Sequence, residues 1–256
     1  MSLFSRRRIF WIGCLVSLIA PCEAQVNIER LRPEVSTGTT GLIQLDLTLR
    51  SGNVDLIEIT PAAAIGFSQG AMRWTLLASG DLGWEDGERF ANEALAHIRL
   101  NRRLRPRLGI EAYGQANYDK ARRLDTRYLV GAGFRFCVSG DGVESWFGSS
   151  LMAESERHEV LPADFHAADT DDLRWSSYLS VRASISETAG LTGTVYVQPV
   201  VSAFDDYRVL ADISIDTRIT GKLSLSVSAA VRRDSDPVGG VAETDSRLST
   251  GLGMNW

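Results

Sequence analysis

The pattern of apolar and polar positions is clearest in the last nine residues of the chain. Leu248, Thr250, Leu252, Met254 and Trp256 alternate there with small or polar residues. Successive side chains of a β-strand point to opposite faces, so one face of this segment is apolar and the other is small or polar. A strand that offers apolar residues to lipid, small or polar residues to a lumen, and ends on an aromatic residue is typical of an outer-membrane β-barrel.

The same period-two alternation, interrupted by turn residues, recurs along the chain and predicts about twelve strands. An even number of strands at this spacing favours an all-β fold, a transmembrane antiparallel up-and-down β-barrel. The expected strands cover residues 41–51, 54–67, 71–84, 92–103, 107–118, 125–138, 143–156, 173–186, 191–204, 207–219, 223–234 and 246–256. The longest connections, about 157–172 and 235–245, are expected at the extracellular end if both termini are periplasmic.

The alternation also assigns each strand residue to lipid or to the lumen. Ile213, Ile215 and Ile219 are expected to face lipid, whereas Asp212, Asp216 and Arg218 of the same strand face inward. An Arg or Lys at the lipid-facing midplane would cost about 2 to 4 kcal/mol, so this division is physically required. Outward aromatic residues fall into two predicted belts at headgroup depth: Phe67, Trp74, Phe136, Phe147 and Trp256 at the periplasmic end, and Trp84, Tyr118, Tyr128, Trp175 and Tyr207 at the other.

The first 24 residues have the pattern of a secretory signal peptide. Arg6 to Arg8 precede a twelve-residue apolar run, Ile9 to Ala20, and small residues favour cleavage before Gln25. The run is too short for a transmembrane helix, which needs about 20 apolar residues. We therefore expect a signal peptide at 1–24, an N-terminal periplasmic segment at 25–39 that is either a tail or a small insert in the lumen, and a barrel at 40–256.

Charge and cysteine content narrow the possible partners. Without residues 1–24, Lys and Arg fall from 27 to 24 and Asp and Glu from 32 to 31, which gives a net charge of −7. So acidic a chain is a poor partner for nucleic acid. Cys137 is then the one remaining cysteine, so no intramolecular disulfide is expected. The predicted location is the outer membrane of a Gram-negative cell, with outer-membrane lipids, lipopolysaccharide, small solutes or ions, and the barrel-assembly machinery (through the C-terminal strand) as partners.

Three segments resemble the salt-induced outer-membrane protein family, a domain family without an assigned molecular function. They are Ser51-Gly52-Asn53-Val54-Asp55, the stretch from Asp125 to Phe136, and the stretch from Arg233-Asp234-Ser235-Asp236-Pro237 through Thr250-Gly251-Leu252-Gly253. The resemblance covers roughly residues 40 to 256. It implies an outer-membrane barrel associated with salt or osmotic stress, and it implies no catalytic residues.

The predicted lumen carries charges of both signs. Two interpretations stay open: a structural network of ion pairs that fills a narrow barrel, or the wall of a pore with modest ion selectivity, in which Tyr113, Trp146, Tyr178 and Tyr196 could stack on a solute. The candidate lumen-lining residues are Asp46, Glu58, Arg99, Glu111, Arg127, Arg135, Arg174, Arg182, Asp212, Asp216, Arg218 and Arg247.

An enzyme is the alternative class, because a Ser–His pair in a barrel could hydrolyse lipids at the outer membrane. The sequence offers Ser149 and Ser150 after Gly148, but no Gly-x-Ser-x-Gly setting. His97 is expected to be a hydrogen-bonding residue of the lumen. The acidic loop with Asp164, His166, Asp169, Asp171 and Asp172 could collect a divalent cation, yet its spacing matches no known calcium loop. We therefore expect no enzyme activity, no cofactor and no metal site.

Overall fold

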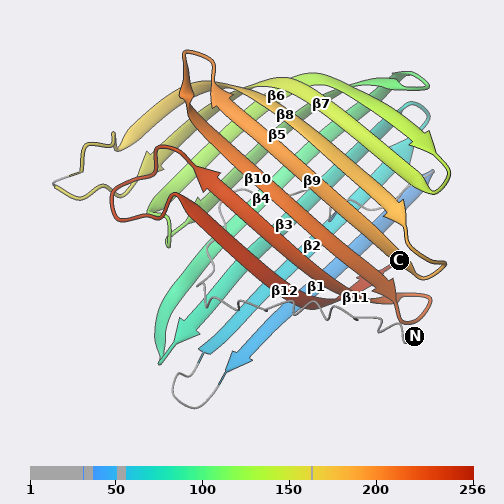
Figure 1. The fold of residues 1–256 in the computed structure, drawn as a ribbon, viewed down its shortest axis with the longest axis horizontal. Helices are drawn as coiled ribbons and strands as arrows, with labels where there is room; N and C mark the ends of the chain where they lie inside the picture. The colour runs from blue at the N-terminus through green and yellow to red at the C-terminus, as the bar shows by residue number, and fades with distance from the viewer. Residues whose placement is uncertain (1–30, 32–36, 51–55, 163) are drawn as a thin grey trace, which may run out of the picture.

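The computed structural model describes residue 31 and residues 37–50, 56–162 and 164–256, and these form a closed antiparallel barrel (Figure 1). The predicted fold class and the predicted number of strands are confirmed. In the described part of the chain, no helix is long and apolar enough to cross a membrane. The strands are β1 (Gly38–Arg50), β2 (Leu56–Gln69), β3 (Met72–Glu85), β4 (Glu88–Arg105), β5 (Leu108–Asp119), β6 (Leu124–Gly140), β7 (Val143–His158), β8 (Asp169–Ser184), β9 (Ala189–Val200), β10 (Ala203–Arg218), β11 (Leu223–Asp234) and β12 (Thr244–Asn255).

Each strand pairs with the next one along the chain, and β1 pairs with β12 to close the barrel. We call the end with the short turns between β2 and β3, β4 and β5, and β6 and β7 the turn end, and the opposite end the loop end. The closing ladder is short, because it joins Leu42–Asp46 to Gly251–Asn255 at the turn end. The ladder between β1 and β2 is longer and runs from Gly38 to Arg50.

Several strands are longer than the alternation predicts. β8 begins at Asp169 rather than residue 173, and Asp169 pairs with Arg157 of β7. β9 ends at Val200 and β10 begins at Ala203, so the two-residue turn between them lies four residues earlier than expected. The four residues added at the start of β8, Asp169 to Asp172, are polar on both faces, so no apolar period marks them. Backbone pairing with a neighbouring strand extends them instead.

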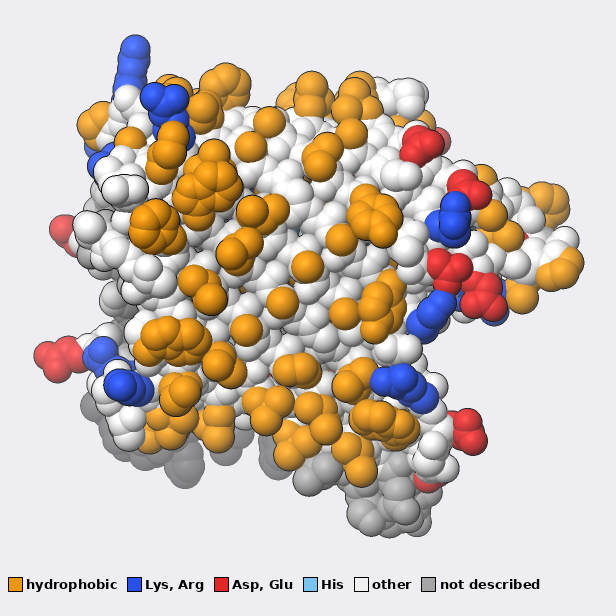
Figure 2. Space-filling view, turned by 180° about the vertical axis from the view of Figure 1, so that it is seen from behind, with side chains coloured by type: hydrophobic (Ala, Val, Ile, Leu, Met, Phe, Trp, Pro, Cys, Tyr) orange, Lys and Arg blue, Asp and Glu red, His pale blue; other side chains and the backbone are white. Residues whose placement is uncertain are grey.

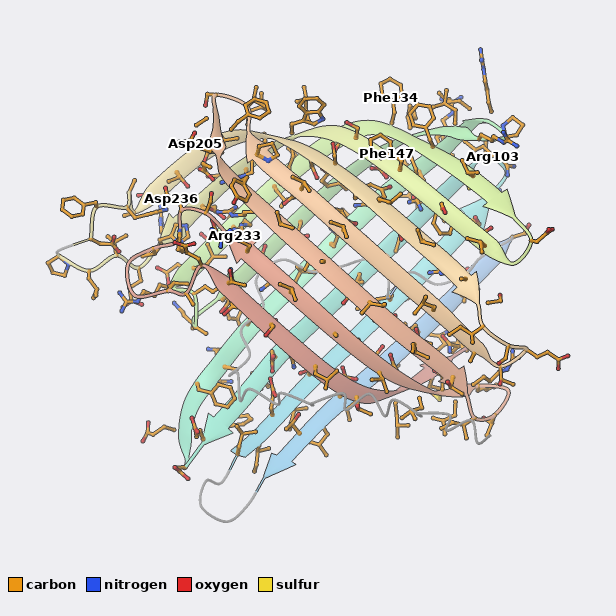
Figure 3. All side chains as sticks on the ribbon, viewed as in Figure 1. Arg103, Phe134, Phe147, Asp205, Arg233 and Asp236 are labelled. Carbon is orange, nitrogen blue, oxygen red and sulfur yellow. The ribbon has the colours of Figure 1, made fainter. Side chains whose placement is uncertain are left out.

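The outer surface has the apolar character that the alternation predicts. Ile213, Ile215 and Leu225 are exposed on the outside, whereas Asp212 and Ser214 are buried on the inside. Figure 2 shows apolar side chains spread over the strands, with Lys, Arg, Asp and Glu at the two ends. Phe134 and Phe147 stand out from the convex face in Figure 3, while Arg103 lies at one end and Asp205, Arg233 and Asp236 at the other.

Leu31 of the predicted N-terminal segment lies inside the barrel. Its side chain is buried against Ala64 of β2, Leu77 of β3 and Leu95 of β4. The strand alternation points all three of these side chains into the lumen. At this residue, the segment therefore occupies lumen volume. The predicted signal peptide at 1–24 lies outside the described residues.

The C-terminal residue closes the barrel at the turn end. The backbone N–H groups of Gly41 and Trp256 each donate to the other residue's carbonyl oxygen at 3.1 Å. The Trp256 ring covers Gly41 so closely that a Cβ atom at position 41 would lie 2.1 Å from a ring carbon. Glycine at this position is thus required by the close approach of the indole.

Replacing Gly41 with alanine is expected to push the Trp256 ring aside and destabilise the barrel by about 1 kcal/mol or more, as overpacking typically does. Gly190→Ala of β9 is the matched control, because a Cβ there meets only the Ala183 carbonyl oxygen at an ordinary 3.7 Å. For the measurement, samples are heated to increasing temperatures before a gel, and the temperature at which the folded band disappears is recorded for each variant. Equal temperatures for the two variants would contradict the proposed packing role of Trp256.

Candidate functional site: the charge cluster and the basic vestibule

Six charged side chains form a buried cluster in the loop half of the lumen. We call the following group the charge cluster: Arg127 of β6, Glu154 and Glu156 of β7, Arg174 of β8, Arg208 of β10 and Asp234 of β11. Each of these side chains is at most 11% exposed. Three guanidinium groups and three carboxylates give these six side chains no formal net charge, and Arg174 also pairs with the partly exposed Asp206 at 3.0 Å. Neutrality matters because an uncompensated buried ion costs several kcal/mol.

The carboxylates of β7 are the centre of the charge cluster. Glu154 accepts from Arg208 Nη1 at 2.6 Å and from Arg174 Nε at 2.8 Å, and it lies 3.5 Å from Arg127 Nε. Glu156 pairs with Arg127 and accepts from Arg208 Nη2 at 2.9 Å. β7 and β10 are separated by two strands, so Arg208 spans part of the bore rather than following the wall.

A second group of buried hydrogen bonds and ion pairs lies beside the junction of β1 and β12. Arg247 of β12 donates to Asp81 of β3 at 2.6 Å, and to Glu58 and Thr60 of β2 at 3.0 and 2.7 Å. Its position is on the loop side of Gly251, where the backbone ladder between β1 and β12 has ended. The guanidinium group therefore links β12 to β2 and β3 across β1, beyond the residue pairs of the β1–β12 ladder.

Charged and aromatic side chains pack together in the middle of the lumen, along the wall formed by β4 to β9. Glu111 of β5 accepts from Arg99 at 3.3 Å, Asn101 at 3.2 Å and the Tyr178 hydroxyl at 3.0 Å. Tyr178 also packs on Tyr196, with ring centroids 5.1 Å apart. The cavity between these side chains has a volume of only about 40 Å³.

A large cavity of about 1170 Å³ opens at the turn end, and we call it the basic vestibule. Seven arginines line this cavity, and its acidic lining residues are Asp141 and Glu144. The lining therefore has a formal excess of five positive charges. The whole chain, in contrast, has a net charge of −5. The seven arginines are Arg73 of β3, Arg102, Arg103 and Arg105 of β4, Arg107 of the following turn, Arg135 of β6 and Arg182 of β8.

Aromatic rings hold two of these arginines. The Arg135 guanidinium carbon lies 5.1 Å from the centroid of the Trp146 ring and 5.8 Å from that of Tyr178. The Arg182 guanidinium carbon lies 5.8 Å from the Trp146 centroid. Such cation–π contacts are worth about 0.5 to 2 kcal/mol each. They fix the two guanidinium groups beside one indole at the inner end of the basic vestibule.

Loop contacts cover part of the loop end. Arg122, in the connection after β5, pairs with Asp245 of β12 on another part of the barrel rim. Asp164 of the β7–β8 loop accepts backbone N–H groups from His166 at 3.1 Å and from Gly239 of the β11–β12 loop at 2.8 Å. The His166 N–H in particular holds the pKa of the Asp164 carboxyl below its ordinary value, because a donated hydrogen bond stabilises the charged form.

Residues 43–256 match the model of one protein family, DUF481, which is described as a protein of unknown function. The chain belongs to the DUF481 family. This confirms the predicted family of barrels without an assigned function, while the salt-induced name itself stays a prediction. No curated protein sequence matches the chain.

Several solved structures are similar to this DUF481 barrel at low sequence identity. A NanC porin is 9% identical with a TM-score of 0.52, over 82% of this chain and 97% of the porin. A KdgM porin is 8% identical with a TM-score of 0.44, over 83% and 98%. The translocator domain of the autotransporter NalP from Neisseria meningitidis is 14% identical with a TM-score of 0.45, over 90% and 91%. The first likeness supports the fold, an outer-membrane type of barrel.

Eleven of the twelve candidate lumen residues lie along the inner wall of the DUF481 barrel. Arg127 and Arg174 belong to the charge cluster, Glu58 pairs with Arg247, Arg99 pairs with Glu111, and Arg135 and Arg182 line the basic vestibule. Asp46 accepts from Gln44 at 2.9 Å, Asp212 is buried, and Asp216 accepts from Ser214 at 3.2 Å. The exception is Arg218, which is exposed at the turn end and donates to the Glu187 carbonyl oxygen at 2.5 Å, because β10 has reached the rim there.

Several important residues were outside the candidate set. Glu154, Glu156, Arg208 and Asp234 complete the charge cluster. The last three lie near the ends of β7, β10 and β11, and strand ends are the part of a strand that alternation predicts least precisely. The two glutamates are two residues apart in β7, so the alternation of the strand places both on the lumen face. Arg103, Arg105 and Arg107 fell in or beside a predicted turn. The signal that could have found them is the dense run of arginines from residue 102 to residue 107.

The residues considered for a hydrolase have other partners. The Ser150 hydroxyl bonds to the Tyr113 hydroxyl at 2.8 Å and to the Ser176 carbonyl, and Ser149 accepts from Trp175 at 2.8 Å. His97 bonds to Gln115 through Nδ1 at 3.1 Å, as expected for a residue of the lumen. The geometry gives the hydrolase alternative no support. Among the described residues, no group of three or more His, Cys, Asp or Glu side chains could hold a metal ion.

Proposed function

We propose that this protein is a narrow outer-membrane channel for small solutes, without enzymatic activity, that prefers anions. The basic vestibule carries the proposal, because a purely structural barrel has no need for a cavity of about 1170 Å³ lined by seven arginines. Positive charge on the walls of a cleft focuses the electrostatic field and raises the local concentration of anions. Rings of Arg or Lys favour anions in pores by the same electrostatics.

The proposal includes the position of the protein in the cell. A cleaved signal peptide at 1–24 would direct export, and the turn end with the basic vestibule would face the periplasm. The apolar outer surface would contact outer-membrane lipids, the loop end would contact lipopolysaccharide, and the last strand would be read by the barrel-assembly machinery. A role in salt or osmotic stress rests on the family resemblance alone.

A structural role is the second candidate. The observation that favours it is the charge cluster, since buried ion pairs that span part of the bore restrict passage through the loop half. The two candidates differ in a measurable property. A channel conducts ions through a planar lipid bilayer, and a filled structural barrel does not.

The test is a recording from the purified, refolded protein in a planar bilayer with a KCl gradient. We expect small discrete steps and a reversal potential that reports preference for chloride over potassium. Cation preference would contradict the role given to the arginines. A complete lack of steps in protein that is folded by gel mobility would exclude the channel and favour the structural candidate.

Cys137 offers a direct probe of the basic vestibule, because it lies in the vestibule lining and forms no disulfide. At low salt, an anionic methanethiosulfonate reagent is expected to modify Cys137 about tenfold faster than a cationic one, relative to their rates on a small thiol, because charged clefts raise encounter rates. In about 1 M KCl the difference should largely disappear through screening. Leu161→Cys with Cys137→Ser moves the probe to the loop end. Equal ratios at both positions would contradict a local positive field.

A further inference from the structure

Two arginines and one indole ring meet at the inner end of the basic vestibule, where Glu144 of β7 is in register with Arg182 of β8. Arg135 and Arg182 approach it from β6 and β8, and Trp146 of β7 lies between those strands. Arg135 is only 6% exposed. We infer that this place, which we call the Trp146 site, binds small organic carboxylates through the guanidinium groups of Arg135 and Arg182. The inference rests on the proposed function, because it names the solute class of that channel.

Preorganisation supports the assignment. A free arginine side chain carries about 2 kcal/mol of rotamer entropy, part of which is lost when it binds a ligand. The contacts of Arg135 with Trp146 and Tyr178, and of Arg182 with Trp146, restrict that freedom in advance. A guanidinium group stacked on a ring still directs its N–H donors outward in its own plane. That geometry matches the two oxygens of a carboxylate.

The surroundings favour an organic anion over an inorganic one. The Trp146 indole lines the basic vestibule together with the arginines, so apolar surface is available for a carbon skeleton. The volume of about 1170 Å³ exceeds that of a small dicarboxylate and of typical small-molecule pockets, which are roughly 300 to 1000 Å³. A solute therefore remains hydrated on one side, and we expect weak, salt-dependent binding suited to release.

Binding is tested without conduction, by isothermal titration calorimetry of succinate into the folded protein in detergent at low salt. The wild-type protein is expected to bind succinate, and to bind inorganic phosphate and neutral glucose at least about tenfold more weakly. The double variant Arg135→Gln with Arg182→Gln is expected to lose at least about tenfold in affinity. Each tenfold loss corresponds to about 1.4 kcal/mol.

The matched control removes the same charge from the opposite end of the barrel. Arg157 and Arg233 are 67% and 43% exposed at the loop end, where they pair with Asp169 and Glu243. Arg157→Gln with Arg233→Gln should leave succinate affinity unchanged. If both double variants weaken binding equally, the effect is long-range attraction and the Trp146 site is refuted.

A single variant keeps the test independent of total charge. Arg135→Lys preserves the positive charge but removes the planar pair of donors, so it should still weaken succinate binding, whereas a field effect would leave affinity intact. Equal affinity for phosphate and succinate would overturn the carboxylate assignment. Lack of succinate binding by a wild-type protein that conducts would overturn the Trp146 site and leave the proposed channel standing. Succinate binding by a protein that does not conduct would overturn the proposed channel and leave the Trp146 site standing.

Discussion

Replacing Glu154 with glutamine is expected to destabilise the folded barrel by about 3 kcal/mol or more, which is the usual cost of removing one partner from a buried ion pair. Glu154 is 2% exposed and accepts from Arg174 and Arg208, with Arg127 nearby. The substitution keeps the size of the side chain and removes its charge. The charge cluster would then hold three guanidinium groups against two carboxylates in a poorly hydrated interior. Chemical unfolding in lipid vesicles, followed by tryptophan fluorescence, measures the change in the free energy of unfolding.

Asp169 provides the matched control for this substitution. It pairs with Arg157 of the same strand as Glu154, at 2.8 Å, but its side chain is 69% exposed. Asp169→Asn should therefore cost less than about 1 kcal/mol, because solvent and salt screen an exposed pair. If the two substitutions destabilise the barrel equally, the charge cluster is hydrated and does not stabilise the fold as described.

Replacing Tyr178 with alanine is expected to raise the single-channel conductance by about twofold or more, since conduction through a narrow pore depends on its tightest section. The Tyr178 ring lies between the 40 Å³ cavity of the mid lumen and the basic vestibule, where it contacts Arg135. Its hydroxyl reaches Glu111 of β5, across two intervening strands. The measurement is the step size in a planar bilayer, compared with that of the wild-type protein.

The control is Tyr178→Phe, which keeps the ring and removes only the hydrogen bond to Glu111. It should leave the conductance near the wild-type value. Unchanged conductance in Tyr178→Ala would mean that ions pass elsewhere in the lumen. A similar increase in both variants would assign the constriction to the Glu111 hydrogen bond instead of to the bulk of the ring.

The barrel architecture could be predicted because each strand has a lipid face and a lumen face with opposite solvation. Ile213 and Asp212 are neighbours in sequence, yet one is exposed on the outside and the other buried within. Because successive residues face lipid and lumen in turn, apolar and polar residues alternate with a period of two in the sequence. Strand ends were predicted less well. The polar stretch at the start of β8 carries no such period, and its extent is set by pairing with β7.

The sequence by itself determined the fold class, the number of strands, and which face of each strand is apolar and which is polar. The reason is that hydrocarbon excludes charge at the outward positions. Only the tertiary structure decided which charges meet. Glu58 and Arg247 are 189 positions apart and form one pair, and Arg208 reaches two carboxylates three strands away. The tertiary structure also decided the surroundings of each arginine. Arginines of the charge cluster pair with carboxylates, whereas those of the basic vestibule outnumber the carboxylates beside them. The physical reason is that alternation reports the face of a residue, whereas distances across a lumen depend on barrel closure, strand tilt and register.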